Sequence, residues 1–312
     1  MKRIVSVILL CCLCRLAAAQ TNDEVDVGDM LDAAQQFAQD NLDPDVLRAL
    51  QNVDRDKVQD FLNHYQDYLH GDYVVDVAQL KEAAQAILPL LEAHEETQPY
   101  AAWLRARLDY FEAADELKRA MPPPPAVQPG KPLPPPQNPP FRMEQELWVK
   151  KVAPRPWPKG AAEIVPKLKA VFVREHVPAE LVWLAEVESG FDGSAQSPGG
   201  ALGLFQLMPA TAKNYGLRLW PRDQRRQPEL AARAAARYLR GLHEKFADWR
   251  LAVAAFNCGE GTVARALKRH RIKTYEQIAS HLPAETQMYV PKVEATIQHR
   301  EGADLEALKA GA

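Results

Sequence analysis

The sequence predicts a mainly α-helical protein of two domains behind a short leader. Apolar residues recur at every third or fourth position in both halves of the 312-residue chain, which is typical of amphipathic helices. The stretch "PPPPAVQPGKPLPPPQNPP", residues 122–140, is too rich in proline for helix or sheet and predicts a polyproline II spacer. An apolar fraction of 47% with 25% charged residues is that of a soluble globular protein.

The first nineteen residues have the pattern of a secretory signal peptide. Two basic residues precede the apolar run 4–13, and three alanines at 17–19 provide a small-residue cleavage site. We therefore expect cleavage after Ala19 and export to the periplasm or cell envelope. An uncleaved membrane anchor is the alternative, but this apolar run, followed by Arg15, is shorter than the roughly 20 residues that span a bilayer.

Cysteine usage gives no sign of a disulfide framework. Three of the four cysteines, at positions 11, 12 and 14, lie in the leader, so the mature chain keeps only Cys258. The residues before the leader cysteines fit a lipoprotein signal poorly, which makes lipid anchoring the less favoured alternative. We interpret Cys258 as a small packed residue rather than a nucleophile.

Charge divides the mature chain sharply. Residues 20–140 carry a net charge of −13, whereas residues 141–312 carry +7. A mildly basic half suits an anionic substrate or partner. Its lysines and arginines are spread over many segments without a recognition motif, so the sequence argues against nucleic acid as a partner.

The acidic helical domain is predicted to span residues 20–120, followed by the proline-rich linker 121–140. Helical spacing predicts helices over 46–65, 77–91 and 99–119, with a break at Gly71-Asp72. The domain contains no catalytic pattern. We interpret it as a binding or spacing module, whose partner would be an envelope protein.

The remaining domain, residues 141–312, is expected to begin with an extended segment over 141–160, because prolines stand at 154, 156 and 158. Helices are predicted over 161–176 and 178–189. Pro178 stands at a first helical position, and Gly190 ends the second helix.

Two glutamates near the end of that second helix differ in the face they occupy. At 100° per residue, Glu188 shares the apolar stripe of Leu184 and Ala185, whereas Glu186 lies on roughly the opposite face. A carboxyl on a buried face has a raised pKa, which makes it available as a proton donor near neutral pH. Helix geometry alone fits equally well a core glutamate that bonds to the backbone of the following loop.

Four motifs in one order resemble the catalytic core of the lytic transglycosylase family, of the soluble-lytic-murein-transglycosylase (SLT) type within the lysozyme-like superfamily. They lie within about residues 165–295, and the likeness within that family is greatest to the membrane-bound type D branch. The matching residues are Glu188-Ser189 with the downstream Ser197, then Gly203, Gln206, Met208 and Pro209, then Phe256, Asn257 and Gly259, and finally Glu285, Tyr289 and Val290.

The resemblance implies a lysozyme-like helical domain that cleaves the β-1,4 bond between N-acetylmuramic acid and N-acetylglucosamine in peptidoglycan glycan strands without water. Glu188 would act first as acid and then as base, and the product would be a 1,6-anhydromuramic end. A lysozyme-like muramidase that uses the same acid with water is the nearer alternative. A non-catalytic wall-binding scaffold is the more distant one.

The resemblance also implies contacts to the sugars, which we expect from Ser197, Gln206, Met208, Phe256, Asn257, Glu285 and Tyr289. Ser197 also suits an ordinary loop, and Glu285 suits a helix cap. The family commonly has tyrosine at position 256, so we expect Ser197 or Tyr289 to orient Glu188 instead. No His/Cys/carboxylate cluster has the spacing of metal ligands, so the sequence implies no metal and no cofactor.

Overall fold

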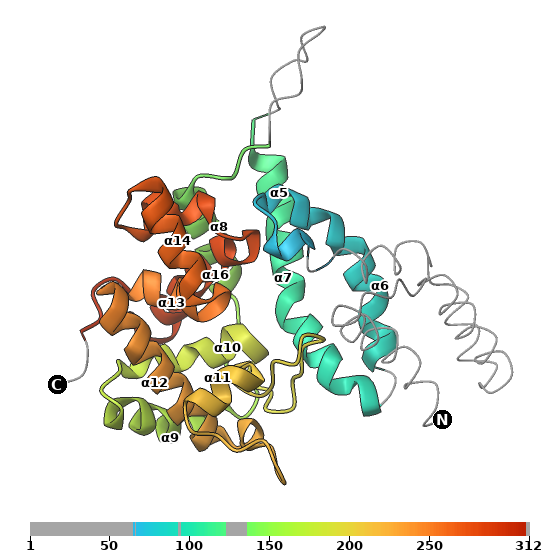
Figure 1. Cartoon of the computed structure of the whole chain (residues 1–312). Helices are drawn as coiled ribbons and strands as arrows, with labels where there is room; N and C mark the ends of the chain where they lie inside the picture. The colour runs from blue at the N-terminus through green and yellow to red at the C-terminus, as the bar shows by residue number, and fades with distance from the viewer. Residues whose placement is uncertain (1–64, 66, 93–94, 123–135, 310–312) are drawn as a thin grey trace, which may run out of the picture.

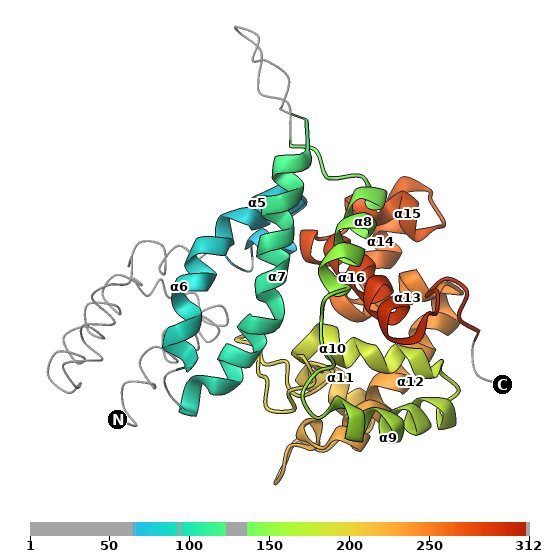
Figure 2. The same ribbon diagram turned by 180° about the vertical axis from the view of Figure 1, so that it is seen from behind.

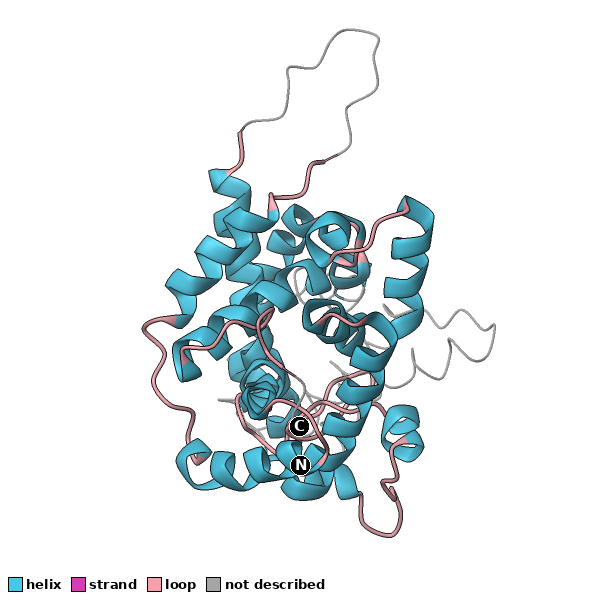
Figure 3. Cartoon of the chain, turned by 90° about the vertical axis from the view of Figure 1, so that its left-hand side faces the viewer, coloured by secondary structure: helices cyan, strands magenta, loops and turns pink. Residues whose placement is uncertain are grey.

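A computed structural model of the protein describes residues 65, 67–92, 95–122 and 136–309. Within these ranges the regular secondary structure is helical (Figure 3). The β pairing there consists of isolated bridges in the loop after α10 (Leu184–Ser189). The mainly α-helical class is therefore confirmed. None of the helices in these ranges is both long and apolar enough to cross a membrane.

The helices predicted before residue 65, like the leader, lie outside the described residues. The described helices before the linker are α5 (Val74–Val77), η1 (Ala78–Leu80), α6 (Lys81–Glu92), η2 (Glu95–Thr97) and α7 (Gln98–Ala120). Those after it are α8 (Phe141–Val152), α9 (Ala161–Arg174), η3 (Ala179–Trp183), α10, α11 (Pro209–Asn214), η4 (Gln224–Arg226), α12 (Pro228–Phe246), α13 (Trp249–Cys258), α14 (Glu260–His270), α15 (Tyr275–Ile278), η5 (Ala279–His281) and α16 (Ala284–Glu301).

The central element is α16, which is buried along most of its length. Helices α5, α8, α10 and α13 all pack against it. Its polar side chains tolerate burial because they find partners inside the protein: the Thr296 hydroxyl donates to the Lys292 carbonyl at 2.7 Å. The helix therefore provides a rigid support for any side chain on its faces.

Helix α8 corrects the expectation of an extended segment over 141–160. Glu144, Trp148 and Val152 recur at four-residue steps and form its buried face, which packs against α16. The prolines at 154, 156 and 158 follow the helix and limit the extended chain to the residues after Val152. In the sequence, the three prolines suggest extended chain and obscure the helical spacing of this buried face.

Helix α7 lies against the helices that follow the linker, beside α8 and close to α10 (Figures 1 and 2). Its Tyr110 ring meets the Trp148 ring of α8 edge on, with centroids 5.3 Å apart. Trp103 and Phe111 of α7 belong to the same hydrophobic core as Trp148. The described helices on the two sides of the linker thus share one core. The boundaries of the acidic domain and the linker stay predictions.

The short helix α10 is buried on every side. It ends at Gly190, whose φ of 63° lies in the left-handed region that glycine adopts without strain. The Ser189 hydroxyl lies 2.9 Å from the Leu204 carbonyl, to which it donates a hydrogen bond. This bond ties the end of α10 to the loop over 190–208 and fixes the position of Glu188.

Candidate active site around Glu188

Glu188 lies in the last turn of α10 and is only 4% exposed. The Tyr289 hydroxyl donates a hydrogen bond to Glu188 Oε1 at 2.7 Å, and a guanidinium nitrogen of Arg107 lies 3.5 Å from Oε2. Burial raises the pKa of Glu188 above its ordinary value, while the charge of Arg107 and the hydrogen bond from Tyr289 oppose that rise. The arrangement suits a carboxyl that both releases and takes back a proton.

Two predicted residues approach this carboxyl from α16. Glu285 and Tyr289 stand four positions apart and so share one face of the helix. Burial raises the pKa of the Tyr289 phenol well above its ordinary value, so the phenol keeps its proton and remains a donor. Glu285 lies in the first turn, as a cap would, and its Oε1 is also 3.5 Å from Arg107 Nε.

The second glutamate of α10 has a different partner. Glu186 is also buried, and its two carboxylate oxygens accept hydrogen bonds from Arg300 at 2.8 and 2.9 Å. Both donors belong to one guanidinium, so the pair is bidentate. The Glu186 carboxylate is therefore occupied by a structural ion pair with Arg300 of α16.

The loop over 190–208 holds three predicted residues. The Ser197 hydroxyl accepts a hydrogen bond from Ala201 N at 2.9 Å, so it closes its own turn. Gln206 Nε2 donates to two carbonyls of the loop, while its buried Oε1 has no partner among the described residues. Met208 is 46% exposed at the start of α11. None of these three side chains bonds to Glu188 in the described structure.

Phe256 and Asn257 stand at the end of α13. The Phe256 ring lies against Tyr238, with centroids 5.3 Å apart. Asn257 Oδ1 accepts a hydrogen bond of 2.6 Å from the Thr286 hydroxyl, which places it beside the first turn of α16. Tyr289, rather than a residue at position 256, is the phenol that bonds the Glu188 carboxyl.

Sequence reasoning missed Arg107, which comes from the acidic half of the chain. The signal was present, because Arg107 lies four residues after Trp103 and three before Tyr110 in the buried stripe of α7. A charged residue in an apolar stripe requires a partner, and here the partners are Glu188 and Glu285. Helical spacing marks Arg107, like Glu188, as a charged group on a buried face.

Other reactive groups nearby have structural partners. Asp192 Oδ1 accepts hydrogen bonds from the backbone N and the hydroxyl of Ser194, and exposed Glu260 pairs with Lys245 at 3.1 Å. Burial raises the pKa of the Cys258 thiol to about 11, which keeps it protonated at neutral pH. The described residues include no group of three or more metal-ligating side chains.

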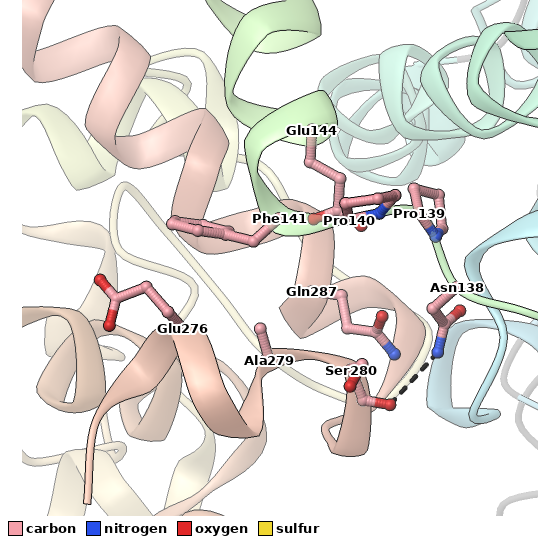
Figure 4. Close-up of a pocket in the computed structure, with 9 residues that line it drawn as sticks. All are labelled: Asn138, Pro139, Pro140, Phe141, Glu144, Glu276, Ala279, Ser280 and Gln287. Carbon is pink, nitrogen blue, oxygen red and sulfur yellow. Dashed lines mark hydrogen bonds between the residues drawn. The ribbon is translucent and has the colours of Figure 1, made fainter. Parts of the chain in front are cut away.

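A cavity of about 270 Å³ lies apart from these residues, between the end of the linker, α8 and the start of α16 (Figure 4). Glu144 lines it, and both of its buried carboxylate oxygens lack a partner among the described residues. Burial raises the pKa of Glu144 well above its ordinary value. None of the predicted site residues lines the cavity, so we assign it no catalytic part.

Comparison with known families identifies the segment that carries Glu188. Residues 169–279 match the family model described as "Transglycosylase SLT domain". This segment is an SLT domain. The resemblance drawn from the sequence motifs is confirmed there. Glu285 and Tyr289 follow the matched SLT domain, and Arg107 precedes it.

Similar proteins cover only part of this chain. "Membrane-bound lytic murein transglycosylase D" of Escherichia coli K12 is 40% identical over 124 residues, which are 38% of this chain and 27% of that protein. "Peptidoglycan transglycosylase gp16" of Escherichia phage T7 is 48% identical over 81 residues, which are 25% of this chain and 6% of that protein.

Among solved structures, this chain is similar to an inactive variant of lytic transglycosylase Slt from Pseudomonas aeruginosa. The match covers 89% of this chain and 50% of the Pseudomonas chain. The TM-score is 0.43, with 18% identity.

Proposed function

We propose that the protein is a peptidoglycan lytic transglycosylase, with Glu188 as its catalytic acid and base. The observation that carries the proposal is the environment of Glu188 in the SLT domain. Burial favours the protonated carboxyl, whereas Tyr289 and Arg107 stabilise the ionised form. The names of the similar proteins from Escherichia coli and phage T7 support the same reaction class.

The proposed reaction uses one carboxyl in two steps. Protonated Glu188 gives its proton to the glycosidic oxygen between N-acetylmuramic acid and N-acetylglucosamine as the bond from that oxygen to the muramic acid anomeric carbon breaks. Ionised Glu188 then removes the proton of the muramic acid 6-hydroxyl while that oxygen bonds to the anomeric carbon. The product is a 1,6-anhydromuramic end, no water is consumed, and Glu188 regains its proton.

The remaining site residues are proposed to contact the sugars or to shape the site. Gln206 Oε1, which is buried and has no partner among the described residues, is suited to accept a hydrogen bond from a substrate amide N–H. Ser197, Asn257 and Glu285 offer further polar groups, and exposed Met208 offers an apolar contact. Phe256 is proposed to pack rather than to bond.

We further propose an envelope location. The leader over residues 1–19 directs export in this proposal, with cleavage after Ala19, and the relative from Escherichia coli is described as membrane-bound. Residues 20–120 are proposed to form an acidic helical domain that binds an envelope protein, with residues 121–140 as its linker. The charge difference between the two halves supports a role for the first half beyond that of a spacer.

Substitution of the two glutamates of α10 tests the proposal. Glu188→Gln should abolish digestion of purified peptidoglycan, with a loss of about 10²-fold or more, because a carboxamide is too weak an acid to protonate the glycosidic oxygen. Glu186→Gln is the control: it weakens the pair with Arg300 and lowers the Tm, but the activity of each folded molecule is retained. Equal loss of activity in two folded variants would contradict the assignment.

A further inference from the structure

Helix α7 lies outside the SLT domain, yet its Arg107 places a guanidinium cation beside the Glu188 carboxyl. We propose that Arg107 is a positioning residue of the active site, which holds the Glu188 carboxyl in place and stabilises its ionised form. The inference rests on the proposed function of Glu188. It extends the active site to a helix from the acidic half of the chain, which the motifs give no reason to include.

Arg107 makes contacts that fix its guanidinium from several sides. One nitrogen donates to the Glu188 carbonyl at 3.2 Å, and a second lies 3.5 Å from Glu188 Oε2. Nε lies 3.5 Å from Glu285 Oε1, and the guanidinium carbon lies 5.1 Å from the centroid of the Trp103 ring. Because the guanidinium is rigid and planar, these partners fix its orientation as well as its position.

The position of α7 along α16 is fixed next to Arg107, at the carbonyl of Ala106. Lys292 of α16 is buried, and its Nζ lies 3.1 Å from the Ala106 carbonyl and 2.9 Å from Asp109 Oδ1, donating to both. Asp109 also pairs with Arg155, beyond the end of α8. This anchor holds α7 against α16 and leaves Arg107 facing Glu188.

Two further contacts hold α7 at its ends. The backbone N of Gln196, in the loop after α10, donates to the Pro99 carbonyl at 2.9 Å. Near the other end, Lys151 of α8 lies 2.7 Å from Glu116. Because α7 is held at both ends and in the middle, Arg107 has little freedom to move away from Glu188.

The groups that face Glu188 come from two helices, α7 and α16, and they differ in their effect on the pKa of its carboxyl. From α7 come the Arg107 cation and the neutral phenol of Tyr110, whose pKa burial raises well above its ordinary value. From α16 come Tyr289 and Lys292, which lower the pKa of Glu188, and Glu285, which raises it. Arg107 has the largest lowering effect, and its removal leaves the ionised carboxyl in a buried site with less compensation.

The experiment compares three variants of the full chain with the wild type. Arg107→Met removes the cation but keeps an unbranched side chain, and Arg107→Lys restores the charge without the planar fork. Arg105→Met is the matched control, because Arg105 is exposed on the same helix and pairs with Glu92 instead. Each variant is first shown to be folded by circular dichroism and thermal melting.

Two readouts are taken. The pKa of Glu188 is measured by NMR titration of ¹³C-labelled glutamate carboxyls, with its resonance assigned by its disappearance in Glu188→Gln. The rate of peptidoglycan digestion is measured against pH, with kcat and KM determined at the optimum. The titration needs no substrate, so it tests Arg107 even if the protein proves to have another activity.

Arg107→Met should raise the pKa of Glu188 by about 1 unit, move the high-pH limb of the rate profile upward and lower kcat about tenfold, with little change in KM. Arg107→Lys should keep the pKa within about half a unit of the wild type and recover part of kcat. Arg105→Met should match the wild type. An unchanged pKa of Glu188 in folded Arg107→Met would overturn the inference, even if the Tm fell.

Failure of the proposed function would look different. In that case the wild type would produce no anhydromuramic ends, or Glu188→Gln would remain active, while the titration would still show whether Arg107 controls the proton of Glu188. Failure of the present inference leaves an active wild type, an inactive Glu188→Gln and an Arg107→Met variant whose Glu188 titrates normally.

Discussion

Helices α7 and α10 meet at Glu188 and differ in what their sequences reveal. Helix α10 lies in the SLT domain, and its motif singles out Glu188 as the proposed catalytic residue. Helix α7 lies outside that domain in a strongly acidic half of the chain, and it matches no motif. It nevertheless places Arg107 beside the same carboxyl. A motif thus singles out the residue that is proposed to react, whereas the charged and polar groups around it come from packing between distant segments.

The two helices also differ in how they are held. Helix α10 is buried on every side and is tied to its loop by Ser189. Helix α7 combines apolar contacts with ion pairs to residues after the linker, among them Lys292 with Asp109 and Lys151 with Glu116. Breaking these pairs should therefore affect α7 first and Glu188 only as a consequence.

The largest effect is expected from Asp109→Ala. The variant leaves Lys292 buried with one carbonyl partner in place of an ion pair, so it should lower the free energy of unfolding by about 3 kcal/mol and reduce activity together with it. Denaturant unfolding and digestion assays on the same preparation measure both.

Asp115→Ala provides the control for that variant. Asp115 is on the same helix, but its partners Lys81 and Arg119 belong to the helices before the linker. Its loss should cost less than about 1 kcal/mol and leave activity intact. If both variants behaved alike, the ion pairs of Asp109 would not be what holds α7 in place.

Tyr289→Phe is expected to change the free energy of unfolding less than Asp109→Ala does, but to lower the reaction rate strongly. Loss of the hydrogen bond to Glu188 should cost about 10-fold to 100-fold in activity and raise the pKa of the carboxyl, so activity should persist to higher pH. Phe256→Tyr should be tolerated with an unchanged profile, because the ring at 256 lies against Tyr238. A fully active Tyr289→Phe beside an inactive, folded Phe256→Tyr would reverse the two assignments.

Glu144→Gln should change stability without changing the reaction. The native state raises the pKa of Glu144, so it binds the proton more tightly than the unfolded chain does. The free energy of unfolding should therefore fall as the pH rises from about 4.3, the ordinary pKa of glutamate, toward the raised pKa of Glu144 in the folded protein. The variant should lack this slope and gain about 1 kcal/mol at neutral pH.

Glu146→Gln is the matched control for Glu144, since Glu146 is exposed on the same helix. Denaturant unfolding at pH 4, 6 and 8 compares the two. The account would be contradicted if the free energy of unfolding changed with pH in the same way in the wild type and in Glu144→Gln. That result would show that Glu144 is ionised in the folded protein.

The smallest effect is expected from Cys258→Ala. The thiol is half-buried, and its pKa of about 11 leaves almost no thiolate at neutral pH. Activity should be retained and the free energy of unfolding should change by about 1 kcal/mol or less. Slow alkylation of the wild-type thiol at pH 7.5 would agree with this, whereas an inactive but folded variant would reveal a working nucleophile.

The sequence predicted the helical class and the buried face of Glu188, because both depend on local spacing. The likeness to the SLT family came from the motifs as a resemblance, and the match over residues 169–279 confirms it. The expectation that Ser197 or Tyr289 orients Glu188 left two residues open, and the hydrogen bond to Glu188 comes from Tyr289 while Ser197 bonds within its own loop.

The sequence did not reveal the partnership of Arg107 with Glu188, since 81 positions separate them and only tertiary packing brings them together. It also predicted extended chain where α8 lies, because the prolines after the helix obscured the helical spacing of Glu144, Trp148 and Val152 on its buried face.

Mass spectrometry of the fragments released from purified peptidoglycan tests the proposed reaction most directly. The full-length wild type should produce fragments that end in 1,6-anhydromuramic acid, because Glu188 is proposed to deprotonate the 6-hydroxyl rather than water. These ends should be absent with Glu188→Gln. Reducing muramic acid ends as the main product, which are heavier by one water, would contradict the account and make the protein a hydrolase.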